Sequence, residues 1–288
     1  MRNGCRRLSI VAAVAVLLAT PLSAATGSAE LVIDDVTVIP MDKESVDEHQ
    51  VVTIRDGVIV DIAGLPARPP GSKAVVIDGR GKVLIPGLVD AHAHITPLRA
   101  IVAGANGRFD RLRSEIQPSH PYDSRVLFAF VREGVTTVFH LGGGGEDVLE
   151  LRDLIHRGSI LGPRLVVGKL IDGPPEAVVD YLHKSPPPSS VEHPETAADG
   201  RAAVGFAVAH HYDFIKSYQH LNEETYDAVQ TAAHAAHLIT MGHLPEIGCS
   251  SCVSPAHPFL VPMNDIAHAE ELGRYAMQND LDPMSSQC

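Results

Sequence analysis

The pattern of hydrophobic and polar residues changes once along the chain, near residue 85. Before that point, short runs rich in Val and Ile are separated by turn residues, as in LVIDDVTVI, VVTIRDGVIVDIAG and AVVIDGRGKVLI. β-branched residues favour strands, and the Asp-Gly pairs at 56–57 and 78–79 favour tight hairpin turns. Residues 30–84 are therefore predicted to form a small antiparallel β-domain.

Beyond residue 85, apolar strands alternate with segments whose apolar residues recur at helical spacing. Strands are predicted over residues 88–94, 135–140, 163–171, 212–218, 238–243 and 265–270. Helices are predicted over 124–133 and 146–157, and a third follows Asn222, a favourable N-cap residue. The buried stripe of that helix is expected to be Tyr226, Val229, Ala233 and Ala236. This alternation predicts a parallel sheet covered by helices, either a doubly wound open sheet or a (β/α)₈ barrel.

The acidic composition argues against nucleic-acid binding. The chain of 288 residues has 23 Lys plus Arg against 35 Asp plus Glu, a formal net charge of −12, whereas nucleic-acid binding usually needs a basic face. The hydrophobic fraction of 45% suits a large core in one or two domains.

The first 25 residues have the three parts of a secretory signal peptide: the cationic MRNGCRR, the apolar IVAAVAVLLA and the small-residue TPLSAA. An uncleaved membrane anchor is the alternative, although the apolar run is short for a bilayer span. We therefore expect a periplasmic or secreted protein with no stable membrane span after cleavage. Cys249 and Cys252 could form a loop disulfide, remain free thiols, act as a redox pair or contribute to a zinc site with His257.

The stretch GKVLIPGLVDAHAHI (Gly81 to Ile95) places two histidines one residue apart at the end of a predicted strand. Side chains two residues apart on a strand point to the same face, so His92 and His94 should project together. Neutral imidazoles are good ligands for zinc-class ions. The chain holds 16 histidines, however, so such pairs also arise by chance and the triplet alone is weak evidence.

The longer pattern resembles the signature of the amidohydrolase superfamily, a PGxxDxHxH segment that leads from a small β-domain into the first strand of a barrel. The matching residues are Pro86, Gly87, Asp90, His92 and His94. EGVTTV at 133–138 is similar to the second barrel strand of that family, and residues 212–245 look like members related to imidazolonepropionase and to Xaa-Pro dipeptidases. The resemblance implies a (β/α)₈ TIM-type barrel with a small N-terminal β-sandwich domain, here 85–288 and 30–84.

The resemblance also implies a site for two divalent metal ions, expected to be zinc. Carried over position by position, His92 and His94 bind one ion, Lys216 is the carbamylated lysine that bridges both, and His243 and His268 bind the other. Each position has an ordinary structural alternative. A lysine on a barrel strand often forms a salt bridge, and His268 lacks the preceding glutamate usual in the family, so that it could be a capping or solvated residue.

The remaining histidines are expected at the edge of the core or on the surface, although His140, at the end of a predicted strand, could contact substrate. The others considered are His210, His211, His234 and His237. The glycine run at 142–145 lacks the Lys-Ser/Thr pair of a phosphate-binding loop and is interpreted as a strand-to-helix connection.

By resemblance, the chain is expected to hydrolyse a carbon–nitrogen bond of a small molecule, a cyclic amide or an Xaa-Pro-type dipeptide, with a metal-activated hydroxide. A complete barrel has eight strands, whereas six are predicted here, and the general-base Asp of the eighth strand has no counterpart. We therefore expect a C-terminally truncated barrel. Assembly into a homo-oligomer is a further expectation. The alternatives are an inactive metal-binding remnant and a deaminase or lactonase of the same fold.

Overall fold

The computed structural model describes residues 30–66, 70–95, 124–142, 146–173, 191–245, 261, 263–268 and 271. The chain divides into two compact units, of which the first ends at Pro86 and the second begins at Gly87. The predicted signal peptide, Cys249 with Cys252, and the glycines at 143–145 lie outside the described residues. No helix in the described ranges is both long and apolar enough to cross a membrane.

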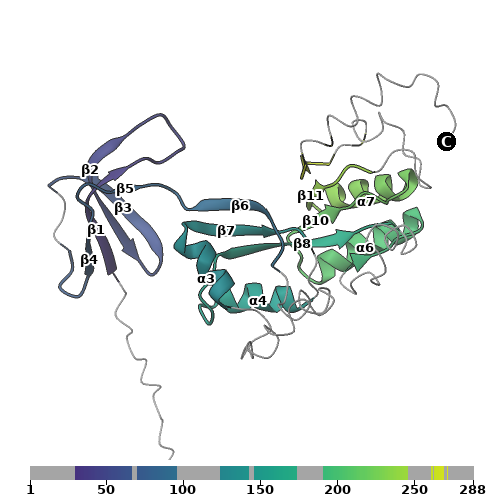
Figure 1. Ribbon diagram of the computed structural model, residues 1–288, viewed down its shortest axis with the longest axis horizontal. Helices are drawn as coiled ribbons and strands as arrows, with labels where there is room; N and C mark the ends of the chain where they lie inside the picture. The colour runs from purple at the N-terminus through teal and green to yellow at the C-terminus, as the bar shows by residue number, and fades with distance from the viewer. Residues whose placement is uncertain are drawn as a thin grey trace, which may run out of the picture. The chain divides into compact units, whose positions relative to one another are not determined.

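The described part of the first unit forms one mixed β-sheet (Figure 1). Its strands are β1 (Glu30–Val38), β2 (Asp47–Arg55), β3 (Val58–Gly64), β4 (Val75–Asp78) and β5 (Val83–Leu84). Strands β1, β2 and β3 are antiparallel neighbours, whereas β4 and β5 both run parallel to β1. Val36, Val38 and Val52 form a small buried core. The prediction of a wholly antiparallel domain is therefore wrong for β4 and β5.

The two Asp-Gly pairs of this sheet have different roles. Asp56 and Gly57, with φ of 50° and 80°, make the predicted hairpin turn between β2 and β3. Asp78 and Gly79 do not make a hairpin, because the strands on either side of them both pair with β1 in parallel. A Cβ on Gly79 would lie 2.7 Å from the Cβ of Val36, so this glycine permits close contact with β1 instead of a reversal of the chain.

The second unit is a parallel sheet in the order β6-β7-β8-β10-β11-β12, with β9 beside β8. Its strands are β6 (Leu88–Ala93), β7 (Val135–His140), β8 (Arg164–Ile171), β9 (Val191–Glu192), β10 (Phe214–Ser217), β11 (Ile239–Gly242) and β12 (Asp265–Ile266). Its helices are α3 (Ser124–Arg132), α4 (Glu146–His156), α6 (Ala197–Ala209) and α7 (Glu223–Ala235).

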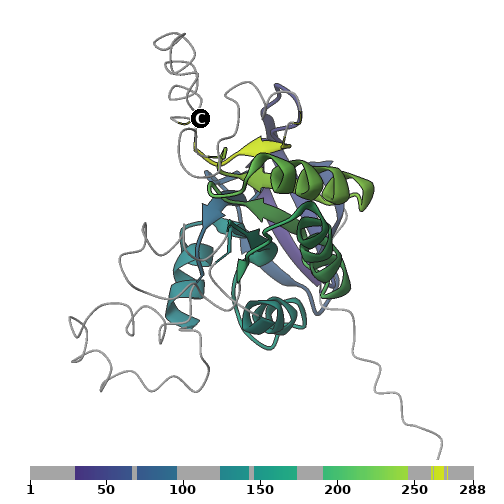
Figure 2. The same ribbon diagram turned by 90° about the vertical axis from the view of Figure 1, so that its right-hand side faces the viewer.

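Helices cover the outer face of this sheet. α3 contacts β7, α4 contacts β8, α6 contacts β10 and α7 contacts β11, and Figure 2 shows the helices arranged around the outside of the strands. Because all strand pairs of the described sheet are parallel and each covering helix follows a strand, the described elements form an incomplete (β/α)₈ barrel. The predicted fold class is thereby confirmed.

Most elements of the second unit were predicted, and α6 is the main exception. Thr196 begins this helix: its side chain accepts the N–H of Asp199, and the Asp199 carboxylate accepts the N–H of Thr196. The helix is rich in Ala and Gly on all sides, so no apolar stripe marks it in the sequence. The next helix, α7, is capped by Asn222 as predicted, with the N–H of Thr225 donating to Asn222 Oδ1 at 2.9 Å.

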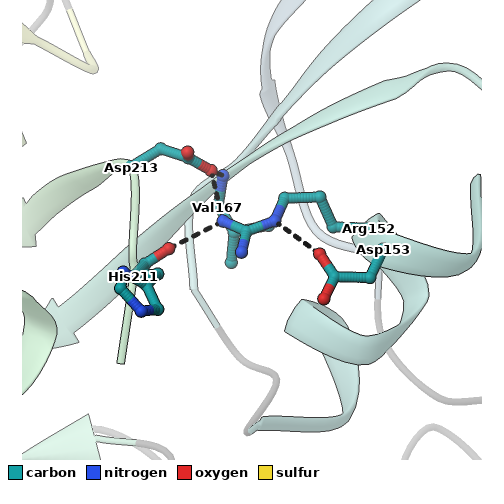
Figure 3. A network of polar contacts seen from close by, with 5 residues as sticks. All are labelled: Arg152, Asp153, Val167, His211 and Asp213. Carbon is teal, nitrogen blue, oxygen red and sulfur yellow. Dashed lines mark hydrogen bonds and ion pairs between the residues drawn. The ribbon is translucent and has the colours of Figure 1, made fainter. Parts of the chain in front are cut away.

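One polar network ties the elements around β10 together (Figure 3). Arg152 on α4 donates to the Asp213 carboxylate at 3.0 Å and to the carbonyl of His211 at 2.8 Å. The same carboxylate accepts the N–H of Val167 on β8 at 2.8 Å. These contacts join a helix, a strand and the residue before β10, and so help to place Lys216 on that strand.

Candidate metal centre

Four of the predicted ligands lie in a row at the carboxyl ends of the strands. The ring centroids are 5.3 Å apart for His94 and His92, 4.9 Å for His92 and His268, and 4.6 Å for His268 and His243. His92 belongs to β6 and His268 follows β12, which are the two edges of the described sheet. The sheet therefore curves far enough to bring side chains from its opposite edges together, as strands of a barrel do.

The first two histidines come from a strand with a bulge. Between Asp90 and Ala93, three steps along β6 correspond to two along β7. The Asp90 carboxylate accepts the N–H of His92 at 3.0 Å within this bulge. The rings of His92 and His94 still point together, with their Nε2 atoms 3.3 Å apart. Asp90 thus stabilises the irregular backbone that carries the pair.

The tautomer of His94 is fixed by a backbone carbonyl just after β7. Its Nδ1 lies 2.9 Å from the carbonyl oxygen of Gly142, and because a carbonyl only accepts, Nδ1 carries the proton. Nε2 of His94 is therefore left with a lone pair. Gly142 has a φ of 91°, and a Cβ there would lie 2.8 Å from the Cβ of Leu170, so glycine is needed at this position.

His243 is oriented by a carboxylate that sequence reasoning missed. Its Nδ1 lies 2.5 Å from Glu271 Oε1, and Glu271 Oε2 accepts the N–H of Leu244 at 2.8 Å. Burial by itself raises the pKa of Glu271, but the bonds from His243 and Leu244 outweigh it and lower that pKa below its ordinary value. The ionised carboxylate fixes the His243 proton on Nδ1, which leaves Nε2 available to a ligand.

Lys216 is fully buried on β10, and its Nζ has no hydrogen-bond partner in the described part of the chain. Burial lowers its pKa to about 8, against a smaller opposing effect of the Glu271 charge. The centroid of the Tyr218 ring is 5.9 Å from Nζ. A buried amine without a partner is costly, and its lowered pKa leaves an appreciable neutral, nucleophilic fraction near neutral pH.

His92 is also held in its neutral form. The pKa of His92 is lowered to about 4, mainly by burial and also by the nearby Lys216, His94 and His268, against a raising effect of a hydrogen bond with the Ala267 backbone. Neutral imidazole is the form that binds metal ions. His92 therefore presents a metal-binding nitrogen at pH 7.

Two observations fit these residues to a divalent metal. Two nitrogen ligands on a tetrahedral zinc ion, each at about 2.0–2.1 Å, stand about 3.3–3.4 Å from each other, and the Nε2 atoms of His92 and His94 are 3.3 Å apart. Within the described residues, the buried Nζ of Lys216 also lacks the structural ion pair that was the alternative for this residue. Within the described ranges, no three His, Cys, Asp or Glu side chains stand with their donor atoms placed around one point, so full coordination needs side-chain adjustment.

A second histidine–carboxylate pair, His220 with Asp172, lies near the pair formed by His243 and Glu271. Asp172, which follows β8, accepts the backbone N–H of His220 at 3.1 Å and also contacts its Nδ1 at 3.1 Å. The ring of Tyr218 lies between the two groups, 6.2 Å from the ring of His220 and 4.3 Å from that of His243. The sequence pattern did not single out Asp172, His220 or Tyr218, because their proximity arises from the ends of two strands, β8 and β10, that are distant in the chain.

The other histidines have varied surroundings. His211, His234 and His237 are exposed, whereas His140 is fully buried at the end of β7 and its Nδ1 accepts the N–H of Ile95. Two surface hollows, of about 730 and 650 Å³, are lined by residues of α6 with α7 and of α4 with the start of β8, and none of the predicted ligands lines either of them.

Comparison with known proteins gives similar folds at low sequence identity. No protein-family model matches the chain. A dihydroorotase of Caldanaerobacter subterraneus subsp. tengcongensis is 26% identical over 38% of this chain. Two solved structures match at 20% identity: a Xaa-Pro dipeptidase with bound methionine, with a TM-score of 0.57 over 75% of this chain, and an amidohydrolase, with a TM-score of 0.60 over 82% of it.

This chain spans only part of each of these proteins. It covers 33% of the dihydroorotase, 57% of the dipeptidase chain and 60% of the amidohydrolase chain.

Proposed function

We propose that the chain forms the metal-binding part of a hydrolase, because its fold is similar to that of a solved amidohydrolase and its sequence carries the matching HxH segment. The proposed ligands are His92, His94, Lys216, His243 and His268. The proposed reaction is hydrolysis of a carbon–nitrogen bond, in a cyclic amide or an Xaa-Pro-type dipeptide. The substrate proposal draws on the names of the similar proteins, a dihydroorotase and a Xaa-Pro dipeptidase.

The observation that carries the proposal is the environment of Lys216. Its amine is fully buried, has no hydrogen-bond partner in the part of the chain that the structure describes, and is close enough to His92 to depress the pKa of that ring. A purely structural lysine would be paired, because an isolated buried charge is strongly unfavourable. Conversion to a carbamate would turn this amine into an anionic oxygen donor beside the histidine cluster.

The residues of the proposed site would have two kinds of role, binding the metal ions and orienting the residues that bind them. Bound divalent ions would activate water and polarise a carbonyl group. The four imidazoles and the modified Lys216 would hold those ions, while Glu271 and the carbonyl of Gly142 keep His243 and His94 in the tautomer whose Nε2 faces outward. Asp90 would keep the bulged end of β6 in place.

Metal analysis tests this proposal directly. The purified chain is incubated with zinc chloride and bicarbonate, desalted and analysed by mass spectrometry for bound zinc. We expect about two zinc ions per chain, and a large loss in His92→Ala and in Lys216→Met. His156→Ala serves as the matched control, because His156 is exposed at the end of α4. Wild-type protein without zinc, or equal zinc in wild type and His92→Ala, would contradict the assignment.

A substrate screen separates the reaction classes. Dipeptides of the Xaa-Pro type, cyclic amides, lactones and aminated bases are offered to the zinc-loaded protein, and product formation is followed by mass spectrometry. Turnover of amides or dipeptides supports the proposal, whereas turnover confined to lactones or aminated bases would replace it. From residues 1–25 alone, we further propose export from the cytoplasm.

A further inference from the structure

The end of β6 is held by the end of β7 at three points. The N–H of Leu141 donates to the carbonyl of Ala93 at 3.0 Å, Nδ1 of His94 donates to the carbonyl of Gly142 at 2.9 Å, and the N–H of Ile95 donates to Nδ1 of His140 at 3.0 Å. The first is an ordinary main-chain contact. The third depends on the identity of a side chain, which makes it specific to this sequence.

This third contact lies just beyond the end of β6. After a bulge between Asp90 and Ala93, Ala93 pairs with His140 and the strand ends. The main chain after His94 therefore needs another partner. Ile95 finds one in His140, since its amide is buried and would otherwise lose a hydrogen bond.

His140 lies on the helix-covered side of the sheet and not among the proposed ligands. Successive residues of a strand alternate in direction, and Val138, two residues earlier, packs in the core beneath the helices. Phe139 packs in a separate cluster with Phe214 and Met241. The His140 ring is fully buried, with its centroid 6.3 Å from that of His94. His140 therefore lies on the opposite face of the sheet from the proposed ligands.

The chemistry of His140 suits this task. Burial lowers the pKa of His140 to about 4, so the ring is neutral at pH 7 and one of its nitrogens accepts a hydrogen bond. Because Nδ1 accepts from Ile95, the proton lies on Nε2, and Nε2 is buried without a hydrogen-bond partner in the described residues. A buried polar atom left unsatisfied costs stability, so packing alone favours an apolar residue here.

We propose that His140 is a positioning residue for the metal centre: its Nδ1 anchors the main chain directly after His94, while the Gly142 carbonyl two residues further on anchors the His94 ring. The pair holds His94 Nε2 beside Nε2 of His92. This inference rests on the proposed function for its purpose, but the anchoring contact itself is a property of the metal-free protein.

The test compares two amide side chains that differ in where they place an oxygen. In His140→Asn the side-chain carbonyl lies near the position of Nδ1 and keeps an acceptor for Ile95, whereas in His140→Gln it lies near Nε2. Val138→Ala is the matched control, because it removes packing from the same face of the same strand without touching the hydrogen bond. All are folded and assayed as full-length chains.

Two readouts are needed. Hydrogen exchange of the Ile95 amide, followed by NMR in metal-free protein, should be slow in wild type, His140→Asn and Val138→Ala, and at least about tenfold faster in His140→Gln. Zinc affinity, measured by competition with a chromogenic chelator, should fall about 10–100-fold in His140→Gln, as expected when a group that orients a ligand is lost, and should change little in the other two.

The outcomes separate the two proposals. If the Ile95 amide exchanges slowly in wild type but wild type binds no zinc, the proposed function is overturned, and with it the role of His140 in positioning a metal ligand. Normal zinc affinity in His140→Gln overturns the role of His140, and so does equal loss in Val138→Ala. If His140→Gln does not fold, the other variants decide. Fast exchange of the Ile95 amide in wild type overturns the hydrogen bond to His140 as an anchor. Slow exchange of that amide together with normal zinc affinity in His140→Asn supports it.

Discussion

Two buried lysines on neighbouring strands have opposite surroundings. Lys169 on β8 and Lys216 on β10 are 3% and 0% exposed, and their strands pair so that Lys216 lies opposite Leu170. Lys169 faces the helices, where its Nζ is 3.0 Å from the Glu192 carboxylate and 4.7 Å from the Phe206 ring centroid. Nζ of Lys216 faces the histidine cluster without a hydrogen-bond partner.

The difference shows which buried charge is structural. Lys169 has the carboxylate and the aromatic ring that a buried ammonium needs for its stability. Lys216 has no hydrogen-bonded carboxylate among the described residues, and the Tyr218 ring lies farther away, at 5.9 Å from Nζ. Burial therefore lowers its pKa, and the fold gains nothing from keeping it charged. A lysine kept at such a cost is more readily explained by a reaction or ligand than by stability.

The largest effect is expected when the structural pair is broken. Lys169→Met leaves the half-buried Glu192 carboxylate without its partner and should lower the free energy of unfolding by about 3 kcal/mol. Urea denaturation at pH 7 measures this. Arg132→Met is the control, because the Arg132–Glu133 pair is exposed on both sides, and exposed pairs contribute little. Equal stability of Lys169→Met and wild type would show that the Lys169–Glu192 pair does not stabilise the fold, and the two lysines would then not differ in this respect.

The opposite sign is expected at the other lysine. In metal-free protein, Lys216→Met removes a buried amine of lowered pKa and replaces it with an apolar chain of similar length. The free energy of unfolding at pH 7 should rise by about 2 kcal/mol, from the difference between the ordinary and the lowered pKa less some packing loss. The same variant should lose zinc binding. A clear loss of stability in this variant would indicate a structural role for Lys216.

The pH dependence of stability sharpens the contrast further. The unfolded Lys216 keeps its proton up to its ordinary pKa of 10.5, whereas the folded residue loses it above about 8. The unfolded state thus binds more protons in this window, so stability should rise with pH between about 8 and 10.5. The slope is at most about 1.4 kcal/mol per pH unit. The difference in stability between wild type and Lys216→Met, followed by urea denaturation, should shrink over this range, and an unchanged difference would speak against a lowered pKa.

The smallest expected effect concerns Glu271, whose charge raises the pKa of Lys216. Glu271→Gln keeps a similar shape but removes that charge, so the pKa of Lys216 should fall further. The rise of stability with pH should then begin at a lower pH. The double variant Lys216→Met with Glu271→Gln is the control and should show no such displacement. A displacement that persists in the double variant would mean that another group titrates.

The sequence identified the proposed ligands but not the groups that orient them. His92 and His94 are marked by their spacing and by the Pro-Gly and Asp residues before them, all within one local stretch. Glu271 could not be chosen over its neighbour Glu270 from sequence, because its contact with His243 depends on how the chain after β12 packs. His140 was expected at the core edge, and its bond to Ile95 depends on the pairing of two strands that are far apart in the chain.

The fold shows the same division. Alternating strand and helix signals predicted the parallel half-barrel, since each signal is a property of a few consecutive residues. The direction of β4 and β5 beside β1 was missed, because an Asp-Gly pair favours a turn locally but cannot specify which strand its neighbours join.

For this protein, the sequence by itself determined the strand ends that carry His92, His94, Lys216, His243 and His268, because hydrophobic periodicity and short motifs act over neighbouring residues. Only the tertiary structure decided that Lys169 is paired and Lys216 is not, that Glu271 meets His243, and that His140 meets Ile95. The physical reason is that pairing and burial of a polar group depend on chain segments distant in sequence, which meet only when the sheet curves and its helices pack.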